Sequence, residues 1–336
     1  MTEFAGEWKK LDNGWIQVKV PLPFSLKWVN SYLLPDEDGE GWTAVDPGLR
    51  TDASVAFWEA ALAQCGISWT AIRRIALTHH HPDHYGLAGW FQERAGGAPV
   101  HMTRIARDAA IRLWGEGETF SDELTRALLS HGLPTELEEG MREHLVSFRR
   151  KVAPHPADVR FIPFGETFRM GGVDWLVLRG EGHAPGHAGF FDAASGRLLC
   201  GDQVLPDITP NIGWMPGGDP DPLGSFLDSV AGMRSLGVSI AYPGHRDPFR
   251  DFGRRLDEIL DHHERRLAKM AEYFEEAESM SAFETCESLF GSRLRSNAHN
   301  LRFALAETIA HLILLEKRGI VRRAEEAGRI RYSAAD

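Results

Sequence analysis

The chain has 336 residues, 43% of them hydrophobic, which is enough for a full core and predicts one large globular domain with a smaller one. The formal net charge of −11 disfavours non-specific binding of nucleic acid, and the three cysteines, Cys65, Cys200 and Cys286, lie too far apart to indicate a disulfide framework or a Cys-rich zinc site. No apolar run approaches the ~20 residues of a membrane span, and the N-terminus lacks the basic-then-apolar order of a signal peptide, so we expect a cytoplasmic protein without a membrane partner.

The N-terminal part is predicted to form a β-meander followed by a β–α unit. Short β-prone runs separated by turn residues lie at 15–20, 28–34 and 41–45. Thr51 or Asp52 can cap a helix over 53–64, which Gly66 can end. An apolar strand over 74–78 comes next and carries a histidine-rich run at its C-terminal end.

The middle of the chain is predicted to add helices and a second meander. A periodic apolar pattern over about 103–151 is typical of helices, and we interpret this segment as a helical insertion. Strands separated by glycine-containing turns are expected at 159–162, 167–170, 173–179, 188–192 and 197–200. This order predicts an α/β (α+β) fold in which packed sheets have helices outside them, an αββα layering.

A long charged helix over 251–278 is expected to lead into a small C-terminal module. The helices predicted in this module lie at 281–290, 298–300 and 304–318, and a hairpin formed by 320–323 and 329–332 follows them. Helices followed by a β-hairpin are typical of a winged helix. We therefore expect a catalytic domain over 1–275 and a winged-helix-like domain over 276–336.

Metal-ligating residue types cluster at the ends of four predicted strands. The densest cluster is the run Thr78-His79-His80-His81-Pro82-Asp83-His84. His79 and His81 are two apart in an extended turn, so both can bind one ion, and Asp83 and His84 then face a neighbouring ion. A loop that merely contains several histidines is disfavoured, because crowded imidazoles need partners when they are buried. The other clusters lie at 182–189, 198–202 and 241–245, and the carboxylate of Asp202 can bridge two cations.

These motifs resemble those of the metallo-β-lactamase superfamily, whose signature is Thr-His-x-His-x-Asp-His followed by separate His, Asp and His motifs. The resemblance implies a metallo-β-lactamase fold and a dinuclear metal centre. It also implies that Asp46, at the end of an early strand, orients a metal-binding histidine. His183 is expected to brace its turn rather than to bind metal. The implied ligands are His79, His81 and His187 for the first metal, Asp83, His84 and His245 for the second, and Asp202 as the bridge.

Two cations about 3.5–4 Å apart can share a water molecule and lower its pKa towards neutrality. The resulting hydroxide is expected to attack a carbonyl or phosphoryl centre, while Asp83 or a metal-held water manages the proton. Asp83 and Asp202 are therefore the expected catalytic carboxylates. Two zinc ions suit this mixed nitrogen and oxygen ligand set best, and iron or manganese would also tolerate it.

The segment that follows Asp202 is expected to bind an apolar acyl group, which favours a small-molecule thioester or ester as the substrate. Trp114 and Phe120, in the helical insertion, either cover the metals as part of a lid or pack in a helical core. The candidate residues for binding the acyl group are Ile208, Ile212, Trp214 and Met215.

The C-terminal run 306–332 resembles the winged-helix appendage of a glyoxalase II-like branch, which contains hydrolases of thioesters and other esters, lactonases and some nucleases. The alternatives are therefore a lactonase with the same mechanism, a phosphodiesterase or nuclease that uses the winged helix, and a mononuclear iron sulfur dioxygenase. Acidic residues dilute the basic character of the wing, so we expect a structural or homodimer-forming wing rather than a nucleic-acid partner. The histidines expected to be surface or packing residues are His262, His263, His299 and His311.

Overall fold

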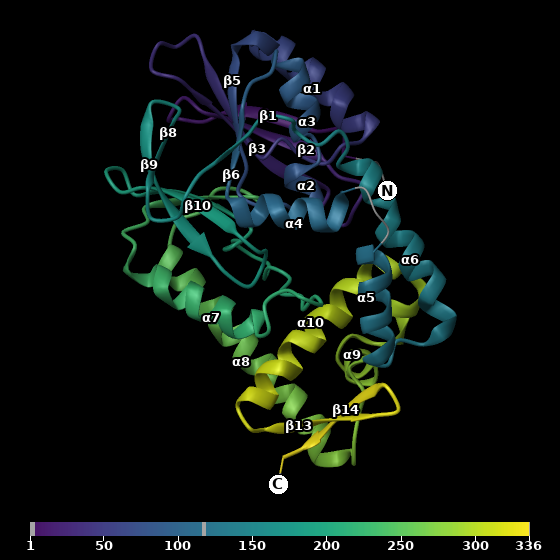
Figure 1. The fold of residues 1–336 in the computed structure, drawn as a ribbon. Coiled ribbons are helices and arrows are strands. Elements are labelled where there is room, and N and C mark those ends of the chain that lie inside the picture. Colours follow the sequence, from purple (N-terminus) through teal and green to yellow (C-terminus); the bar gives the residue numbers. More distant parts are fainter. Residues whose placement is uncertain (1–3, 116–118, 336) are drawn as a thin grey trace.

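The computed structural model describes residues 4–115 and 119–335 and places two β-sheets against each other with helices outside them (Figure 1). A buried apolar layer lies between the sheets. It contains Trp15 and Tyr32 from one sheet and Trp175 and Phe190 from the other. Sheets pack in this way because each buries one apolar face against its neighbour. The predicted αββα layering is confirmed.

The larger sheet of the described chain has seven strands in the order β1-β2-β3-β4-β5-β6-β7. Strands β1 to β4 are antiparallel, and the parallel pairing begins between β4 and β5. Helix α1 joins these two strands; Thr51 caps it by accepting a hydrogen bond from the Ser54 N–H, and Gly66 ends it at φ 69°, as predicted. The strands are β1 (Glu7–Lys10), β2 (Ile16–Pro21), β3 (Trp28–Pro35), β4 (Trp42–Val45), β5 (Ile72–Ala76), β6 (Val100–Met102) and β7 (Val159–Phe161).

The smaller sheet of the described chain has five strands in the order β12-β11-β10-β9-β8. The strands from β8 to β11 are antiparallel neighbours, whereas β12 runs parallel to β11. Consequently β11 and β12 end at the same edge of the sheet. The strands are β8 (Thr167–Met170), β9 (Val173–Gly180), β10 (His187–Asp192), β11 (Arg197–Gly201) and β12 (Ile240–Pro243).

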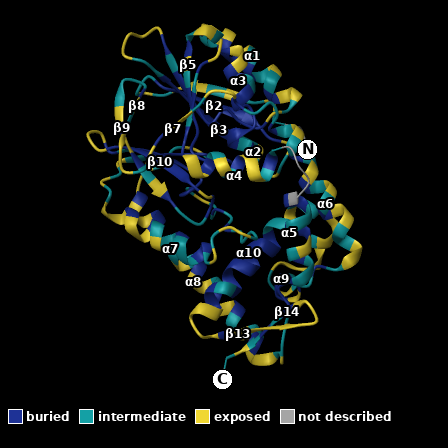
Figure 2. Ribbon diagram, viewed as in Figure 1, coloured by how far each residue is buried: buried dark blue, intermediate teal, exposed yellow. Residues whose placement is uncertain are grey.

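Helices cover the outer faces of both sheets. Helices α1 and α3 pack on the larger sheet, and α7 and α8 pack on the smaller one, with their exposed sides turned to solvent (Figure 2). No helix in the described part of the chain combines the length and the apolar character needed to cross a membrane. The helices are α1 (Asp52–Cys65), α2 (Pro82–Tyr85), α3 (Ala88–Arg94), α4 (Arg104–Trp114), α5 (Thr119–Ser130), α6 (Glu138–Ser147), α7 (Pro222–Gly232), α8 (Phe252–Glu276), α9 (Ala282–Phe290) and α10 (Ala298–Lys317).

The predicted helical insertion contains α4 to α6. Helices α5 and α6 lie beside the C-terminal part of the chain, whereas α4 packs with the core of the larger sheet (Figure 1). Helix α6 contacts α10, and α5 contacts β14 of the terminal hairpin. The two helical pieces predicted within α10 are one continuous helix, because the segment between them contains no helix breaker and Leu301 and Leu305 are buried. The predicted domain boundary at 275/276 coincides with the last turn of α8 and stays a prediction.

The terminal hairpin has a shorter turn than the sequence suggested. Strands β13 (Val321–Glu326) and β14 (Arg329–Ala334) are joined by Ala327 and Gly328, which both have positive φ, at 51° and 76°. Two residues in this conformation form a tight hairpin turn. Glu325 and Glu326 therefore belong to β13, which extends beyond the strand predicted over 320–323, and the predicted end of that strand is wrong.

Candidate metal centre

The histidine-rich run follows β5 and extends into α2. Pro82 occupies the first turn of α2, where its missing N–H costs no helical hydrogen bond. Thr78 anchors the run, because its backbone N–H and its hydroxyl both donate to the Asp46 carboxylate, at 2.8 and 2.6 Å. Asp46 follows β4 directly. Two neighbouring parallel strands therefore bring the run and its anchor to one edge of the sheet.

Side chains from separate loops converge on this run. Asp202 follows β11, and its Oδ2 lies 3.4 Å from His84 Nε2 and 3.3 Å from His245 Nε2. The same oxygen lies 3.7 Å from His183 Nε2, and Asp83 Oδ2 lies 3.3 Å from His245 Nε2. Asp202 is thus the common neighbour of the ring nitrogens that face the centre.

The Nδ1 atoms of three of these histidines are held from outside the centre. His84 Nδ1 lies 3.0 Å from Asp46 Oδ2, which is the contact predicted for Asp46. His183 Nδ1 lies 2.9 Å from the carbonyl oxygen of Asn211, and His245 Nδ1 lies 2.9 Å from that of Trp28. Because a carbonyl oxygen only accepts, Nδ1 must carry a proton there, and Nε2 is the nitrogen that offers a lone pair to the centre when the imidazole is neutral. This is the tautomer that a metal-binding histidine requires.

The donor atoms of the centre fit divalent cations. Within the described residues, His79 Nε2, His84 Nε2, His183 Nε2 and Asp202 Oδ1 are buried without a hydrogen-bond partner. Buried polar atoms are normally satisfied, and imidazole nitrogens with carboxylate oxygens are suitable ligands for zinc and similar ions. Among the described residues, three sets of donors at the centre have atoms within 4.8 Å of one another. Two of these sets share no residue: His79 with His81 and His183, and Asp83 with His84 and His245. The third, Asp46 with His79 and His84, joins them.

The roles predicted for His183 and His187 are reversed by this geometry. His187 is buried at the start of β10, and its Nε2 accepts a hydrogen bond from the backbone N–H of Asp202 at 3.2 Å. It therefore supports the loop that carries Asp202. His183 joins His79 and His81 instead, because Gly182 and Gly186, at φ 86° and 72°, fold the turn so that the first histidine faces the centre.

The ionisation of the centre is shaped by burial and by close opposite charges. Burial, together with neighbouring histidines, lowers the pKa of His79 and His81 well below the ordinary value. Burial also acts to lower the pKa of His245, but the carboxylates of Asp202 and Asp83 outweigh it and raise this pKa to about 10. Burial opposes ionisation of Asp202, yet His245 and His84 hold the pKa of this carboxyl well below its usual range. Neutral imidazoles and an ionised carboxylate are the forms that bind a cation, which would displace the proton held by His245.

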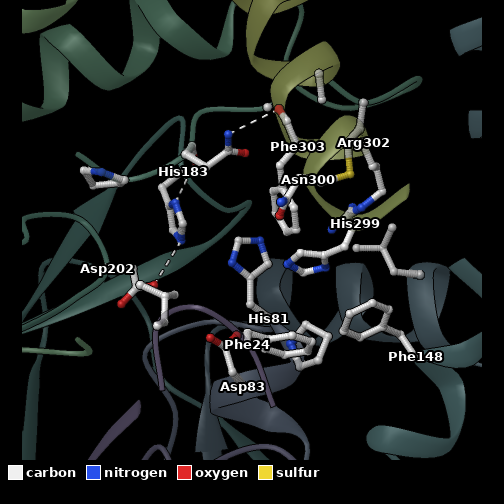
Figure 3. Close-up of a pocket in the computed structure, with 18 of the residues that line it drawn as sticks. Phe24, His81, Asp83, Phe148, His183, Asp202, His299, Asn300, Arg302 and Phe303 are labelled. Carbon is white, nitrogen blue, oxygen red and sulfur yellow. Dashed lines mark hydrogen bonds and ion pairs between the residues drawn. The ribbon is translucent and has the colours of Figure 1, made fainter. Parts of the chain in front are cut away.

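A cavity of about 300 Å³ opens onto the centre (Figure 3). His81, Asp83 and Asp202 form part of its wall. Trp114 and Phe120 also line it, although both are almost fully buried, so they belong to a helical core and to the cavity wall at once. The remaining walls are largely apolar, which makes the cavity suitable for an organic substrate that reaches the centre.

Three of the four residues predicted to contact an acyl group line this cavity. Ile208, Trp214 and Met215 do so, whereas Ile212 is fully buried in the core, so its predicted place in the pocket is wrong. Sequence reasoning also missed the wall that α10 contributes and treated His299 as a surface or packing residue. No spacing or motif in the sequence marks these residues as part of a cavity. The missed cavity-lining residues include Phe24, Phe148, His299, Asn300, Arg302 and Phe303.

Another buried group of potential metal ligands contains His263, Glu307 and His311. The Nε2 of His311 lies 3.2 Å from His263 Nδ1, and its Nδ1 faces the backbone carbonyl of Glu307 at 2.8 Å. The Glu307 carboxylate is paired with Arg266 and accepts a hydrogen bond from Asn211 at 2.8 Å. Most of these donor atoms have partners, although His263 Nε2 is buried without one among the described residues. The buried position of His263 and His311 agrees with the packing role predicted for them.

A buried cluster of histidines and aspartates at the edge of two stacked sheets, with an apolar cavity opening onto it, defines a metal-binding protein of the αββα class. The chain belongs to the metallo-beta-lactamase superfamily, because residues 29–245 match the sequence model of that family. Residues 267–335 match a second family, the metallo-beta-lactamase-like C-terminal domain. The protein is thus a metallo-hydrolase of this superfamily with the associated C-terminal domain.

Proteins of similar length share both parts. A metallo-beta-lactamase family protein from Thermus thermophilus is 34% identical, with a TM-score of 0.83 over 96% of this chain and 98% of that one. A beta-lactamase domain protein from Burkholderia ambifaria is 30% identical, with a TM-score of 0.86 over 100% of this chain and 96% of that one. The protein named "Probable metallo-hydrolase YqjP" from Bacillus subtilis strain 168 is 27% identical over 90% of this chain and 92% of its own length.

Proposed function

We propose that the protein is a dinuclear metal-dependent hydrolase that cleaves the carbonyl bond of a thioester or ester. The observation that carries the proposal is the position of Asp202, whose Oδ2 is the shared neighbour of His183 in one donor group and of His84 and His245 in the other. A carboxylate in this position can bridge two cations with its two oxygens. Two zinc ions are the proposed cofactors, because the donors are imidazole nitrogens and carboxylate oxygens.

When bound, two divalent cations would supply Lewis acidity and a water of lowered pKa. The residues of the chain then hold and orient the reacting groups. The Asp83 side chain is 21% exposed and lines the cavity, so its carboxylate can take up a proton released there. Asp46 and the carbonyl groups of Asn211 and Trp28 fix the rings of the metal-facing histidines. These contacts preorganise the centre, since the rings cannot rotate without losing a buried hydrogen bond.

The apolar walls of the cavity support a carbonyl substrate with an organic acyl part rather than a long polyanion. Trp214 and Met215 line the cavity on the segment that follows Asp202, where an acyl chain would lie beside the reacting carbonyl. A lactone is the second candidate, because the same attack opens its ring and the enclosed cavity accepts a compact molecule. A nuclease or phosphodiesterase would need a basic track for the phosphate backbone, and the chain has a net charge of −11.

Metal analysis and a substrate screen test this proposal. Purified protein should hold about two zinc ions per chain and hydrolyse aryl thioesters or esters faster than lactones and bis-aryl phosphodiesters. Asp202→Asn should abolish turnover, whereas His262→Gln, a change at a half-buried residue of α8 that does not line the cavity, should not alter it. A single iron per chain would favour the sulfur dioxygenase, and phosphodiester cleavage without thioester or ester turnover would favour the nuclease. Either result would overturn the proposal.

A further inference from the structure

The wall of the cavity formed by α10 carries an arginine without a counter-charge. Arg302 and His299 project from this helix on the side of the pocket away from Asp202 and His183 (Figure 3). Among the residues that the structure describes, Arg302 forms no ion pair, and its buried Nε has no hydrogen-bond partner. Burial lowers its pKa to about 10, so the guanidinium still carries its charge at neutral pH. An uncompensated cation beside an apolar cavity is costly, which indicates that an anion meets it there.

The surroundings of Arg302 are basic rather than acidic. His144 on α6 has a buried Nε2 without a partner in the described chain, and its pKa is lowered to about 3 by burial and then by the charge of Arg302. Lys151 likewise has no ion pair among the described residues; its Nζ lies 4.6 Å from the centre of the Phe148 ring. Two other arginines of the C-terminal module are paired with carboxylates, Arg318 with Glu264 at 2.7 Å and Arg295 with Glu287 at 2.6 Å. The pocket therefore holds unpaired positive charge in a chain that is acidic overall.

Aromatic rings form the walls next to this cation. The Phe24 ring is stacked on His299 at 4.8 Å with an interplanar angle of 8°, and Phe148 faces the same ring at 6.2 Å and 21°. The Arg302 guanidinium carbon lies 4.0 Å from the centre of the Phe303 ring. A cation held over a ring keeps its orientation, and these rings line the same cavity as His81, Asp83 and Asp202.

We propose that Arg302 forms an anion subsite and that the substrate is a thioester or ester with a carboxylate or phosphate at the end remote from the reacting carbonyl. This inference rests on the proposed hydrolase function, because it assigns a substrate class to the same cavity. The guanidinium fork binds a carboxylate or phosphate through paired N–H donors, and Lys151 adds positive potential nearby. The apolar part of the cavity wall would contact the neutral body of the substrate.

Matched substrates test the subsite through turnover. One pair compares the S-phenyl monothioester of glutaric acid with its carboxamide isostere, and a second pair places the same carboxylate or carboxamide on the thiol side. The wild-type protein should prefer the anion in one pair by about tenfold to a hundredfold in kcat/KM, as expected for a charge-assisted hydrogen bond. Arg302→Gln should remove this preference, so that the carboxylate and the carboxamide of the pair are hydrolysed with similar kcat/KM. Arg302→Lys should retain part of it, and Arg293→Gln, an exposed arginine of the same module, should retain all of it.

Direct binding separates the subsite from the reaction. Calorimetry with zinc-loaded protein compares 4-phenylbutyrate and 4-phenylbutyl phosphate with the neutral 4-phenylbutanamide, and thus distinguishes a carboxylate subsite from a phosphate subsite. Arg302→Gln should weaken the binding of one of the two anions by about tenfold or more. An unchanged melting temperature would show that the fold is intact. Binding that depends on Arg302 without thioester or ester turnover would support the subsite and overturn the proposed function. Thioester hydrolysis with no preference for the anion in either pair would overturn the subsite alone.

Discussion

Asp46→Asn replaces one carboxylate oxygen of a buried anchor by an amide group of nearly the same size. The Oδ1 of Asp46 accepts a hydrogen bond from the Thr78 N–H at 2.8 Å. Its Oδ2 accepts from the Thr78 hydroxyl at 2.6 Å and faces His84 Nδ1 at 3.0 Å. If the amide oxygen keeps the first contact, the amide N–H₂ faces His84, where two donors would meet. His84 must then rotate or move its proton to Nε2, and either change removes the lone pair that faces the metal centre.

The expected loss of zinc affinity follows from the hydrogen bond between Asp46 and His84 that the substitution removes. A hydrogen bond to a charged group contributes about 1.5–3 kcal/mol, which corresponds to a factor of about 10 to 150 in an equilibrium constant. Changes at residues that orient a metal ligand weaken metal binding over a similar range, about 10- to 100-fold. We therefore expect Asp46→Asn to weaken the affinity for zinc by about 10- to 100-fold while the protein remains folded.

Competition with a chromophoric chelator measures this affinity, and circular dichroism monitors the fold. Asp192→Asn is the matched control, because Asp192 is also a buried aspartate but bonds to Arg197 at 2.8 Å at the far end of β10. The control should lower the melting temperature and leave the zinc affinity unchanged. Wild-type zinc affinity in Asp46→Asn, or an equal loss in the control, would refute the reasoning.

Further predictions concern the same centre. His183→Ala should release about one metal ion per chain in elemental analysis, whereas His187→Ala should keep the metal and lower the melting temperature; equal metal loss would contradict the exchange of their roles. Asn211→Ala and Glu307→Ala should both weaken zinc binding, because the Glu307 carboxylate accepts a hydrogen bond from the Asn211 side-chain amide at 2.8 Å and so fixes the segment whose backbone carbonyl, at Asn211, holds His183; unchanged affinity in both variants would contradict this. In metal-free protein, the raised pKa of His245 means that its pairing with carboxylates stabilises the fold fully below pH 6.5 and is lost as the pH rises through about 10. Melting temperatures of chelator-treated protein should fall across that window more steeply than those of zinc-loaded protein, and parallel curves would contradict this.

The residues that could be predicted are those whose geometry is local. His79, His81, Asp83 and His84 lie within six positions, so the end of one strand brings them together whatever the rest of the chain does. The strand before them was predicted for a similar reason, since its apolar residues are adjacent in sequence. Gly66 was identified as the end of α1 because a left-handed residue is needed there and glycine adopts that conformation without a steric penalty.

The roles of His183 and His187 could not be predicted from the neighbouring sequence alone. Both histidines belong to one turn, and their residue type is the same. Which ring faces the centre depends on the dihedral angles at Gly182 and Gly186 and on the pairing of β10, which commits His187 to support Asp202. Ile212 was misplaced for a related reason, because an irregular loop has no period from which the direction of a side chain can be inferred.

The sequence by itself determined that a cluster of histidines and aspartates follows strands of an α/β fold, because ligand type and strand periodicity are written within a few neighbouring residues. Only the tertiary structure decided how the cluster is completed and what faces it. Asp202 and His245 meet the run because β11 and β12 end at one edge of their sheet. Arg302 reaches the same cavity because α10 packs against the helical insertion, more than 200 positions away from the histidine run. Such contacts depend on the packing of whole layers, which no short stretch of sequence encodes.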